Sequence, residues 1–249
     1  MAIEMTVPMV QFNKRAIPEG RVDYDWVQEN SEDIFSNKRV VVFSLPGAFT
    51  PTCSSTHLPG YEARYNDILE QDVDDVYCLS VNDSFVMNAW FDSLGIENVK
   101  PIADGNGDFT RHMGMLVKKE AVNFGLRSQR YSMVVDNGLV EMIFVEQGKE
   151  DNFADDPFDV SDVDSMLDYL TSIKDVRRDA IADAQQEADQ QDERSGPEAR
   201  SHRSGRRSLS SRPFRRCLGR RFPTLRRLRC SIMINPIRQR TRMKPRLLT

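Results

Sequence analysis

Two apolar runs without polar alternation stand out in the first part of the chain. Residues 40–45 (Val-Val-Val-Phe-Ser-Leu) and 76–81 (Val-Tyr-Cys-Leu-Ser-Val) each predict a strand that is buried on both faces. A helical period follows each run, with Tyr61, Tyr65, Ile68 and Leu69 after the first and Met87, Trp90, Phe91 and Leu94 after the second. Pro59 should bend or shift the start of the first helix. This order of elements predicts parallel strands joined by right-handed crossovers, with helices covering the sheet.

The following part of the chain predicts an antiparallel hairpin and a closing helix. Apolar runs at 131–135 and 139–145 flank Asp136-Asn137-Gly138, and Asn-Gly between two such runs is typical of a hairpin turn. A last helix should start near Ser161, a residue type preferred at N-caps, and carries Val163, Met166, Leu167 and Leu170 on one face. We therefore predict an α/β, thioredoxin-like fold whose mixed central sheet is flanked by helices.

Charge divides the chain into two chemically different segments. The formal net charge is only −4, yet the first 194 residues carry 37 acidic and 17 basic side chains. Residues 195–249 carry 1 acidic and 17 basic side chains, and 16 of the basic ones are arginine. Such a segment cannot bury enough apolar surface to order itself. We expect one domain at 1–172, a helical or linker segment at 173–194 and a disordered basic tail at 195–249.

Cysteine spacing and the N-terminus indicate the compartment. The cysteines are Cys53, Cys78, Cys217 and Cys230, and no two of them form a C-x-x-C pair, so we expect free thiols and neither a disulfide framework nor a zinc site. The first residues show no secretory signal, and no run approaches the roughly 18 apolar residues of a membrane helix. We expect a cytoplasmic protein.

The segment 104–108 (Asp-Gly-Asn-Gly-Asp) superficially resembles a calcium-binding loop. Phe109 and Met115 stand where such a loop needs Gly and Glu, so the segment is interpreted as a turn. No other pattern indicates a metal or a bound cofactor, and we expect neither.

Cys53 is the candidate nucleophile. It follows residues 46–52 (Pro-Gly-Ala-Phe-Thr-Pro-Thr) at the point where a central strand ends and a helix begins, which is where open α/β sheets bind ligands. A cysteine in the first turn of a helix faces unpaired backbone N–H groups and the positive end of the helix dipole, and both favour the thiolate. Thr50 can turn its hydroxyl toward the same point, and Pro46 would shield the thiolate from water.

The partners available to such a thiolate decide what it attacks. An acyl-transfer mechanism needs a histidine base. The chain has three histidines, His57, His112 and His202. His57 lies one helical turn after Cys53, an awkward position for a base. An electrophilic oxygen requires a nearby cation instead, and Arg127 and Arg130 supply it if the strand after them pairs near 40–45.

These residues resemble the active-site motif of the peroxiredoxins. Pro46-x-x-x-Thr50-x-x-Cys53 has the spacing of that family, and the strings at 49–61, 80–90 and 130–135 are similar to its type II, glutathione- or glutaredoxin-dependent branch. The resemblance covers roughly residues 3–172 and extends to the peroxiredoxin part of hybrid peroxiredoxin–glutaredoxin proteins.

The resemblance implies a role for each matching residue. Cys53 would be the peroxidatic cysteine, Thr50 would orient the peroxide, and Pro46 would shield the sulfur. Arg130 is the better match for the family arginine, with Arg127 as the runner-up and a candidate support.

The implied activity is that of a thiol peroxidase in antioxidant defence, which reduces hydrogen peroxide and alkyl hydroperoxides. Cys53 would become a sulfenic acid and be recycled by glutathione, glutaredoxin or thioredoxin, with glutathione as co-substrate. Cys78 aligns with a candidate resolving cysteine of plant-type members, although a cysteine in mid-strand is more often an inert small hydrophobe. Relatives of this branch also suggest a homodimer. The alternative is a redox sensor or adaptor whose Cys53 reacts only once.

The basic tail has two open interpretations. Some relatives carry a glutaredoxin domain with a Cys-Pro-x-Cys motif after the peroxiredoxin domain, and residues 195–249 lack that motif. The tail is, on one hypothesis, a frame-shifted reading of a former glutaredoxin region. The competing hypothesis is a basic arm for nucleic acid or an anionic membrane, but no basic fold motif accompanies it. We expect neither a nucleic-acid nor a membrane partner.

Overall fold

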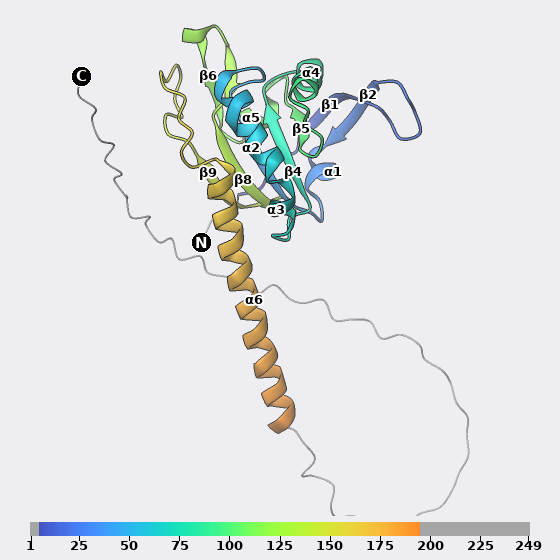
Figure 1. Ribbon diagram of the computed structural model, residues 1–249, viewed down its shortest axis with the longest axis vertical. Helices are drawn as coiled ribbons and strands as arrows, with labels where there is room; N and C mark the ends of the chain where they lie inside the picture. The colour runs from blue at the N-terminus through green and yellow to red at the C-terminus, as the bar shows by residue number, and fades with distance from the viewer. Residues whose placement is uncertain (1–4, 195–249) are drawn as a thin grey trace, which may run out of the picture. The chain divides into compact units, whose positions relative to one another are not determined.

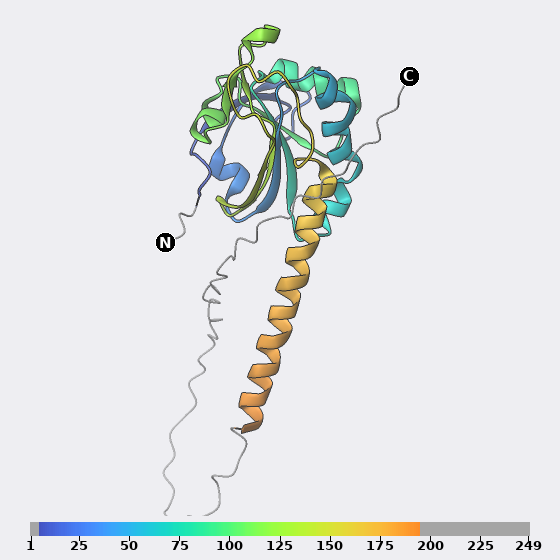
Figure 2. The ribbon, with the colours of Figure 1, turned by 90° about the vertical axis from the view of Figure 1, so that its left-hand side faces the viewer.

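A five-stranded mixed sheet lies at the centre of the computed structural model, which describes residues 5–194 (Figures 1 and 2). Its strands are β3 (Arg39–Ser44), β4 (Asp75–Ser80), β5 (Lys100–Ala103), β8 (Tyr131–Asp136) and β9 (Leu139–Val145). The order is β5-β4-β3-β8-β9, with β4 parallel to both β3 and β5, and with β8 antiparallel to both β3 and β9. The predicted mixed sheet is therefore confirmed, and its four expected strands lie within one residue of their expected bounds.

Shorter elements surround this sheet. Two antiparallel pairs are formed by β1 (Gln11–Ala16) with β2 (Asp25–Asn30) and by β6 (Leu116–Lys118) with β7 (Leu126–Ser128). The helices are α1 (Ser31–Phe35), a π turn (Cys53–His57), α2 (Leu58–Ala63), α3 (Tyr65–Leu69), α4 (Ser84–Leu94), α5 (Asp108–His112), a 3₁₀ turn (Glu120–Val122) and α6 (Val163–Arg194). Of these, β1, β2, β6, β7, α1, α5 and the 3₁₀ turn were not predicted, because none of them contains a continuous apolar run like that of β3 or a helical period longer than one turn.

The side chains of β3 alternate between two apolar layers, one on each face of the sheet. Val41 and Phe43 pack in the layer that α2, α3, α4 and α6 cover, whereas Val40 and Val42 pack in the layer that α1 and α5 cover. All four side chains are fully buried. Burial on both faces explains why this strand shows no polar alternation in the sequence.

The first helix departs from expectation at its start. In place of one helix bent near Pro59, the π turn, α2 and α3 follow one another. Pro59 has no N–H to donate to the carbonyl of Ser55, four residues earlier. Leu58 donates to the carbonyl of Cys53, five residues earlier, which closes the wider ring of a π turn. The proline therefore helps to place Cys53 at the start of a wide turn.

The closing helix starts slightly later than predicted. Ser161 is not its cap, because the Asp162 carboxylate accepts a backbone N–H of the first turn at 2.8 Å, while the Ser161 hydroxyl donates to Glu146 at 2.8 Å. α6 then continues without a break to Arg194, so the segment 173–194 is a continuation of this helix (Figure 1).

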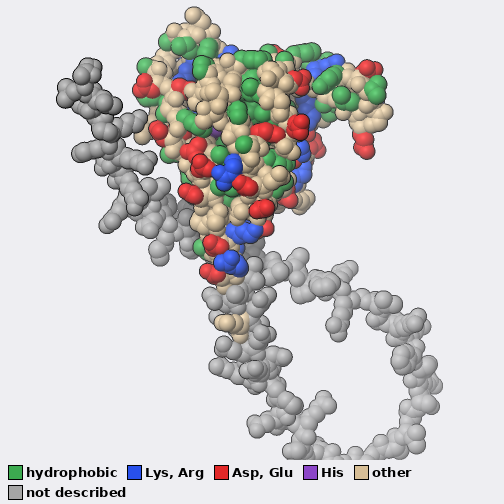
Figure 3. Space-filling view, viewed as in Figure 1, with side chains coloured by type: hydrophobic (Ala, Val, Ile, Leu, Met, Phe, Trp, Pro, Cys, Tyr) green, Lys and Arg blue, Asp and Glu red, His purple; other side chains and the backbone are tan. Residues whose placement is uncertain are grey.

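The described part of the chain is rich in acidic side chains, and Figure 3 shows them spread over the viewed face and along the first turns of α6. Within residues 5–194, no helix is long and apolar enough to cross a membrane. The predicted basic tail at 195–249 lies outside the described residues.

Candidate active site

Antiparallel pairing of β3 with β8 assembles the site. Ser44, the last residue of β3, pairs with Tyr131, the first residue of β8. Arg130 precedes Tyr131 and so lies at the carboxyl end of β3, where the loop that leads to Cys53 also begins. The pairing expected from the sequence is therefore confirmed. It brings Arg130 to Cys53, which lies 77 positions earlier in the chain.

Cys53 is the first residue of the π turn and is fully buried. Its helical segment starts at Pro51, so the Cys53 N–H belongs to the first turn, where backbone donors have no partner within the helix. The Ser54 N–H donates to the carbonyl of Thr50 at 3.0 Å. Trp90 of α4 anchors the same turn, since its indole Nε1 donates to Ser54 Oγ at 3.0 Å.

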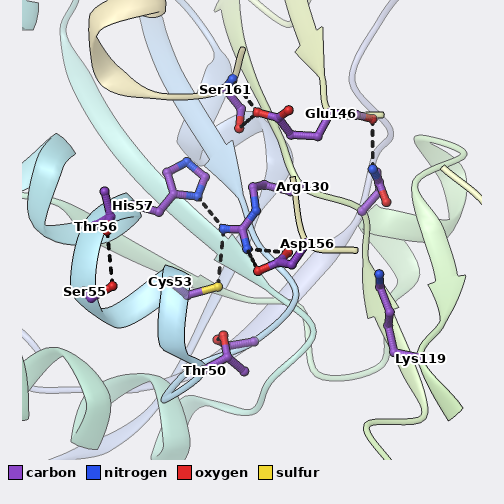
Figure 4. A network of polar contacts seen from close by, with 12 residues as sticks. Thr50, Cys53, Ser55, Thr56, His57, Lys119, Arg130, Glu146, Asp156 and Ser161 are labelled. Atoms are coloured by element: carbon purple, nitrogen blue, oxygen red, sulfur yellow. Dashed lines mark hydrogen bonds and ion pairs between the residues drawn. The ribbon is translucent and has the colours of Figure 1, made fainter. Parts of the chain in front are cut away.

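Arg130 joins the sulfur to two further side chains (Figure 4). Its Nη1 donates to Cys53 Sγ at 3.5 Å and contacts Nδ1 of His57 at 3.1 Å. Its Nη2 donates to both carboxylate oxygens of Asp156 at 2.6 Å. Because a guanidinium only donates, His57 Nδ1 must accept, which makes the imidazole neutral with its proton on Nε2.

Burial and charge set the protonation of these groups. Burial pushes the pKa of His57 well below its usual 6.5, and the neighbouring charge of Arg130 lowers it further. Burial opposes the charged form of Arg130, but the Cys53 thiolate and Asp156 offset this and leave the pKa of Arg130 raised. The site therefore holds a permanent cation against the sulfur and a neutral imidazole beside it.

The loop before Cys53 is held by a network of its own. The Thr50 hydroxyl donates to the carbonyl of Gly47 at 2.8 Å, and the Thr50 side chain lies near that of Cys53 (Figure 4). Asn82 Oδ1, beyond the end of β4, accepts the Ala48 N–H at 3.0 Å. Phe49 adopts a φ of +62°, which is strained for a bulky residue, and its ring is exposed. Such strain is typical of functional loops.

Pro46 and Arg127 complete this loop. Pro46 is buried where the loop leaves β3. Arg127 does not reach Cys53: its Nη1 donates to the carbonyl of Val81 at 2.7 Å and its Nε to that of Phe124 at 3.0 Å. Of the two arginines considered from the sequence, Arg130 contacts the sulfur, and Arg127 supports neighbouring backbone.

Cys78 lies on β4, opposite Phe43 of β3, in the same apolar layer as Cys53. It is a fully buried free thiol. Burial raises the pKa of Cys78 well above its usual range, and the nearby charge of Cys53 raises it further. Burial and the charge of Cys53 therefore both favour the protonated thiol at Cys78.

Sequence reasoning missed Asp156 and Asn82. Asp156 lies in a long acidic loop, where nothing in the local pattern separates it from its neighbours. Asn82 follows a buried strand, and a polar residue at a carboxyl strand end was the available signal for it. The turn expected at 104–108 is confirmed, because the Gly107 N–H donates to the Asp104 carbonyl at 2.8 Å. The Asp104 carboxylate also accepts the N–H groups of Phe109 and Thr110. Among the described residues, no His, Cys, Asp and Glu side chains cluster as a metal site.

Comparison with known sequences and structures agrees with this geometry. Residues 13–167 match the model of the Redoxin family. A peroxiredoxin of Rhizobium etli is 51% identical over 173 residues, which are 68% of this chain and 97% of that protein. A hybrid peroxiredoxin of Haemophilus influenzae is 52% identical over 164 residues, which are 66% of this chain and 64% of that protein.

Two crystal structures share the fold. The antioxidant protein of Plasmodium falciparum, a 1-Cys peroxiredoxin, superposes with a TM-score of 0.64 at 35% identity and covers 68% of this chain and 99% of its own. Reduced Prx3 of Vibrio vulnificus in complex with hydrogen peroxide superposes with a TM-score of 0.58 at 36% identity and covers 68% and 99%.

Proposed function

This chain belongs to the peroxiredoxins within the Redoxin family and is therefore a thiol peroxidase, and on that premise we propose that Cys53 reduces hydrogen peroxide and alkyl hydroperoxides, with glutathione or glutaredoxin as the recycling thiol. The observation that supports the roles of the residues is the contact, at 3.5 Å, of Arg130 Nη1 with Cys53 Sγ, between two buried side chains. A cation that only donates stabilises the thiolate without quenching it by a proton.

The proposed reaction is a two-electron displacement. The Cys53 thiolate attacks one peroxide oxygen, the O–O bond breaks, and its electron pair leaves on the far oxygen as hydroxide or alkoxide, which a proton converts to water or alcohol. The attacked oxygen stays on Cys53 as the sulfenic acid. Arg130 Nη1 and the Cys53 N–H are the donors near the developing charge, and losing one such donor costs about 10²–10³ in rate.

Thr50 has a different part in the proposal. Its hydroxyl hydrogen is directed at the Gly47 carbonyl, so its oxygen can accept a hydrogen bond from the peroxide. This would align the O–O bond with the sulfur. The buried Pro46 removes a backbone donor and excludes water at the same place.

Recycling is proposed to use an external thiol and no bound cofactor. A first thiol condenses with the sulfenic acid to a mixed disulfide and water, and a second thiol releases the Cys53 thiolate. The burial of Cys78 and its raised pKa favour this route over an internal disulfide. Two free thiols in the described part of the chain also fit a reducing compartment, and we propose the cytoplasm.

A homodimer is proposed from an exposed aromatic pair. Trp26 and Phe85 are 58% and 60% exposed and meet edge to face at 5.7 Å, with the Arg15 guanidinium over both rings. Exposed aromatic and arginine clusters are typical of protein interfaces. Sedimentation should show a dimer that Phe85→Glu weakens.

Steady-state consumption of hydrogen peroxide and tert-butyl hydroperoxide tests the proposal. The wild type, Cys53→Ser, Cys78→Ser and a chain ending at Arg194 are compared with glutathione plus glutaredoxin, and then with thioredoxin. We expect turnover in all but Cys53→Ser. Loss of turnover in Cys78→Ser would instead make Cys78 a resolving cysteine. A wild type that consumes one equivalent of peroxide and stops with every thiol would support the redox-sensor alternative.

A further inference from the structure

Asp156 is the link between the buried arginine of the site and solvent. The Arg130 side chain is 2% exposed, whereas that of Asp156 is 45% exposed. Both oxygens of Asp156 accept from Nη2, and the opposite nitrogen, Nη1, contacts Cys53 and His57. The third nitrogen, Nε, has no partner within the described residues. The orientation of the guanidinium plane therefore depends on two anchored nitrogens, Nη1 and Nη2.

The loop that carries Asp156 is firmly held beside the site. Glu146 is 2% exposed, and its Oε1 accepts the N–H groups of Asp159, Val160 and Ser161 at 2.8–2.9 Å. The Phe158 ring lies 5.6 Å from the Arg130 guanidinium carbon and 4.7 Å from the His57 ring. A loop fixed in this way can impose the position of its carboxylate on Arg130.

The charges favour a role in positioning. Arg130 faces two anions, the Cys53 thiolate and Asp156, so Asp156 draws part of the cation's field away from the sulfur. Removing the carboxylate would leave the thiolate at least as well stabilised. What would be lost is the second anchor that points Nη1 at the reacting atoms, and a misplacement of about 1 Å can cost about 10²-fold in rate.

We propose that Asp156 is a positioning residue that orients Arg130 toward the peroxide bound at Cys53. This inference rests on the proposed role of Arg130 in the peroxidase reaction. Asp156 touches neither the sulfur nor the substrate and acts through the guanidinium alone.

The test compares two reactions of the same sulfur. Reaction with hydrogen peroxide needs Arg130 in place, whereas alkylation by iodoacetamide needs only the thiolate and entry of the reagent. Because Cys53 is fully buried, alkylation rates are compared only between variants that share the same entry. Both rate constants are measured for the wild type, Asp156→Asn and the matched control Asp155→Asn, which removes the same charge from an exposed neighbour. Asp156→Glu keeps a carboxylate and serves as the rescue variant. Alkylation is followed at the Cys53 peptide by mass spectrometry.

We expect Asp156→Asn to slow the peroxide reaction about 10- to 100-fold relative to Asp155→Asn, with alkylation equal or faster. Asp156→Glu should recover part of the peroxide rate. Equal peroxide rates in the two Asn variants would overturn the inference, as would a parallel fall of both reactions. A wild type that does not react with peroxide would instead refute the proposed function.

Discussion

Acid should destabilise this protein through one buried imidazole, that of His57. The side chain is fully buried against Phe43 and Phe158, with ring centroids at 4.8 and 4.7 Å. Burial and the charge of Arg130 hold the pKa of His57 well below 6.5. In the unfolded chain the same imidazole takes up a proton below about 6.5. A histidine whose pKa is lowered by folding contributes stability above its unfolded pKa and loses it as the pH falls toward its folded pKa.

The magnitude follows from the linkage of proton binding to folding. Between about pH 7.5 and about pH 5.5 the unfolded state gains nearly one proton that the native state cannot bind, which lowers the free energy of unfolding by about 1.4 kcal/mol. His57→Asn removes the titration but keeps an acceptor oxygen near the position of Nδ1. All other titratable groups are the same in the wild type and in His57→Asn. The difference between the losses of unfolding free energy that the two proteins show on acidification therefore isolates His57.

Equilibrium urea unfolding at the two pH values, followed by tryptophan fluorescence under reducing conditions, measures the effect. The wild type should lose about 1.4 kcal/mol more than His57→Asn on acidification. His112→Asn is the control, because it makes the same substitution at an exposed histidine. Equal losses in the wild type and His57→Asn would refute the reasoning, since His57 would then accept a proton in the native state.

Three further predictions concern the surroundings of the site. Iodoacetamide should leave Cys78 unmodified in the native protein, because burial raises its pKa well above the usual range; peptide mass spectrometry that finds it labelled before unfolding would contradict this. Trp90→Phe removes the donor to Ser54 Oγ at 3.0 Å and part of a buried ring, and should cost about 1–3 kcal/mol in urea unfolding; an unchanged midpoint would argue against this anchor. Arg39→Ala removes one partner, at 2.9 Å, of the largely buried Glu141, which keeps Arg177 at 3.1 Å and the Tyr169 hydroxyl at 2.9 Å, and it should cost about 1–3 kcal/mol in urea unfolding. Arg39→Ala with Glu141→Ala should recover part of this cost, and no recovery would show that the pair is not coupled.

Local signals in the sequence were sufficient for much of the fold. The hairpin is an example: Asn137 and Gly138 have φ of +49° and +79°, the left-handed conformations that a tight turn of this kind requires and that these residue types adopt most readily. Continuous apolar runs identified the two buried parallel strands for a similar reason, because burial on both faces leaves no polar alternation. The wide turn at Cys53 was only partly foreseen, since Pro59 predicted a disturbance but not its form.

The candidate nucleophile could also be predicted from the sequence, but only some of its partners could. Cys53, Thr50 and Pro46 lie within eight residues of one another, so their spacing alone defines the loop they share. Arg127 and Arg130 were both candidates, because each precedes the same strand. The resemblance to the family favoured Arg130, but the residue pattern itself does not say which guanidinium turns toward the sulfur.

Tertiary structure made that choice. The register of β3 with β8 places Arg130 at the carboxyl end of β3, and the path of the following loop brings Asp156 to it from 26 residues away. The same packing excludes water from His57 and Cys78, and so decides that one imidazole stays neutral and one thiol stays protonated. Periodicity and turn chemistry report on neighbours along the chain, but protonation and orientation depend on what distant segments place around a side chain.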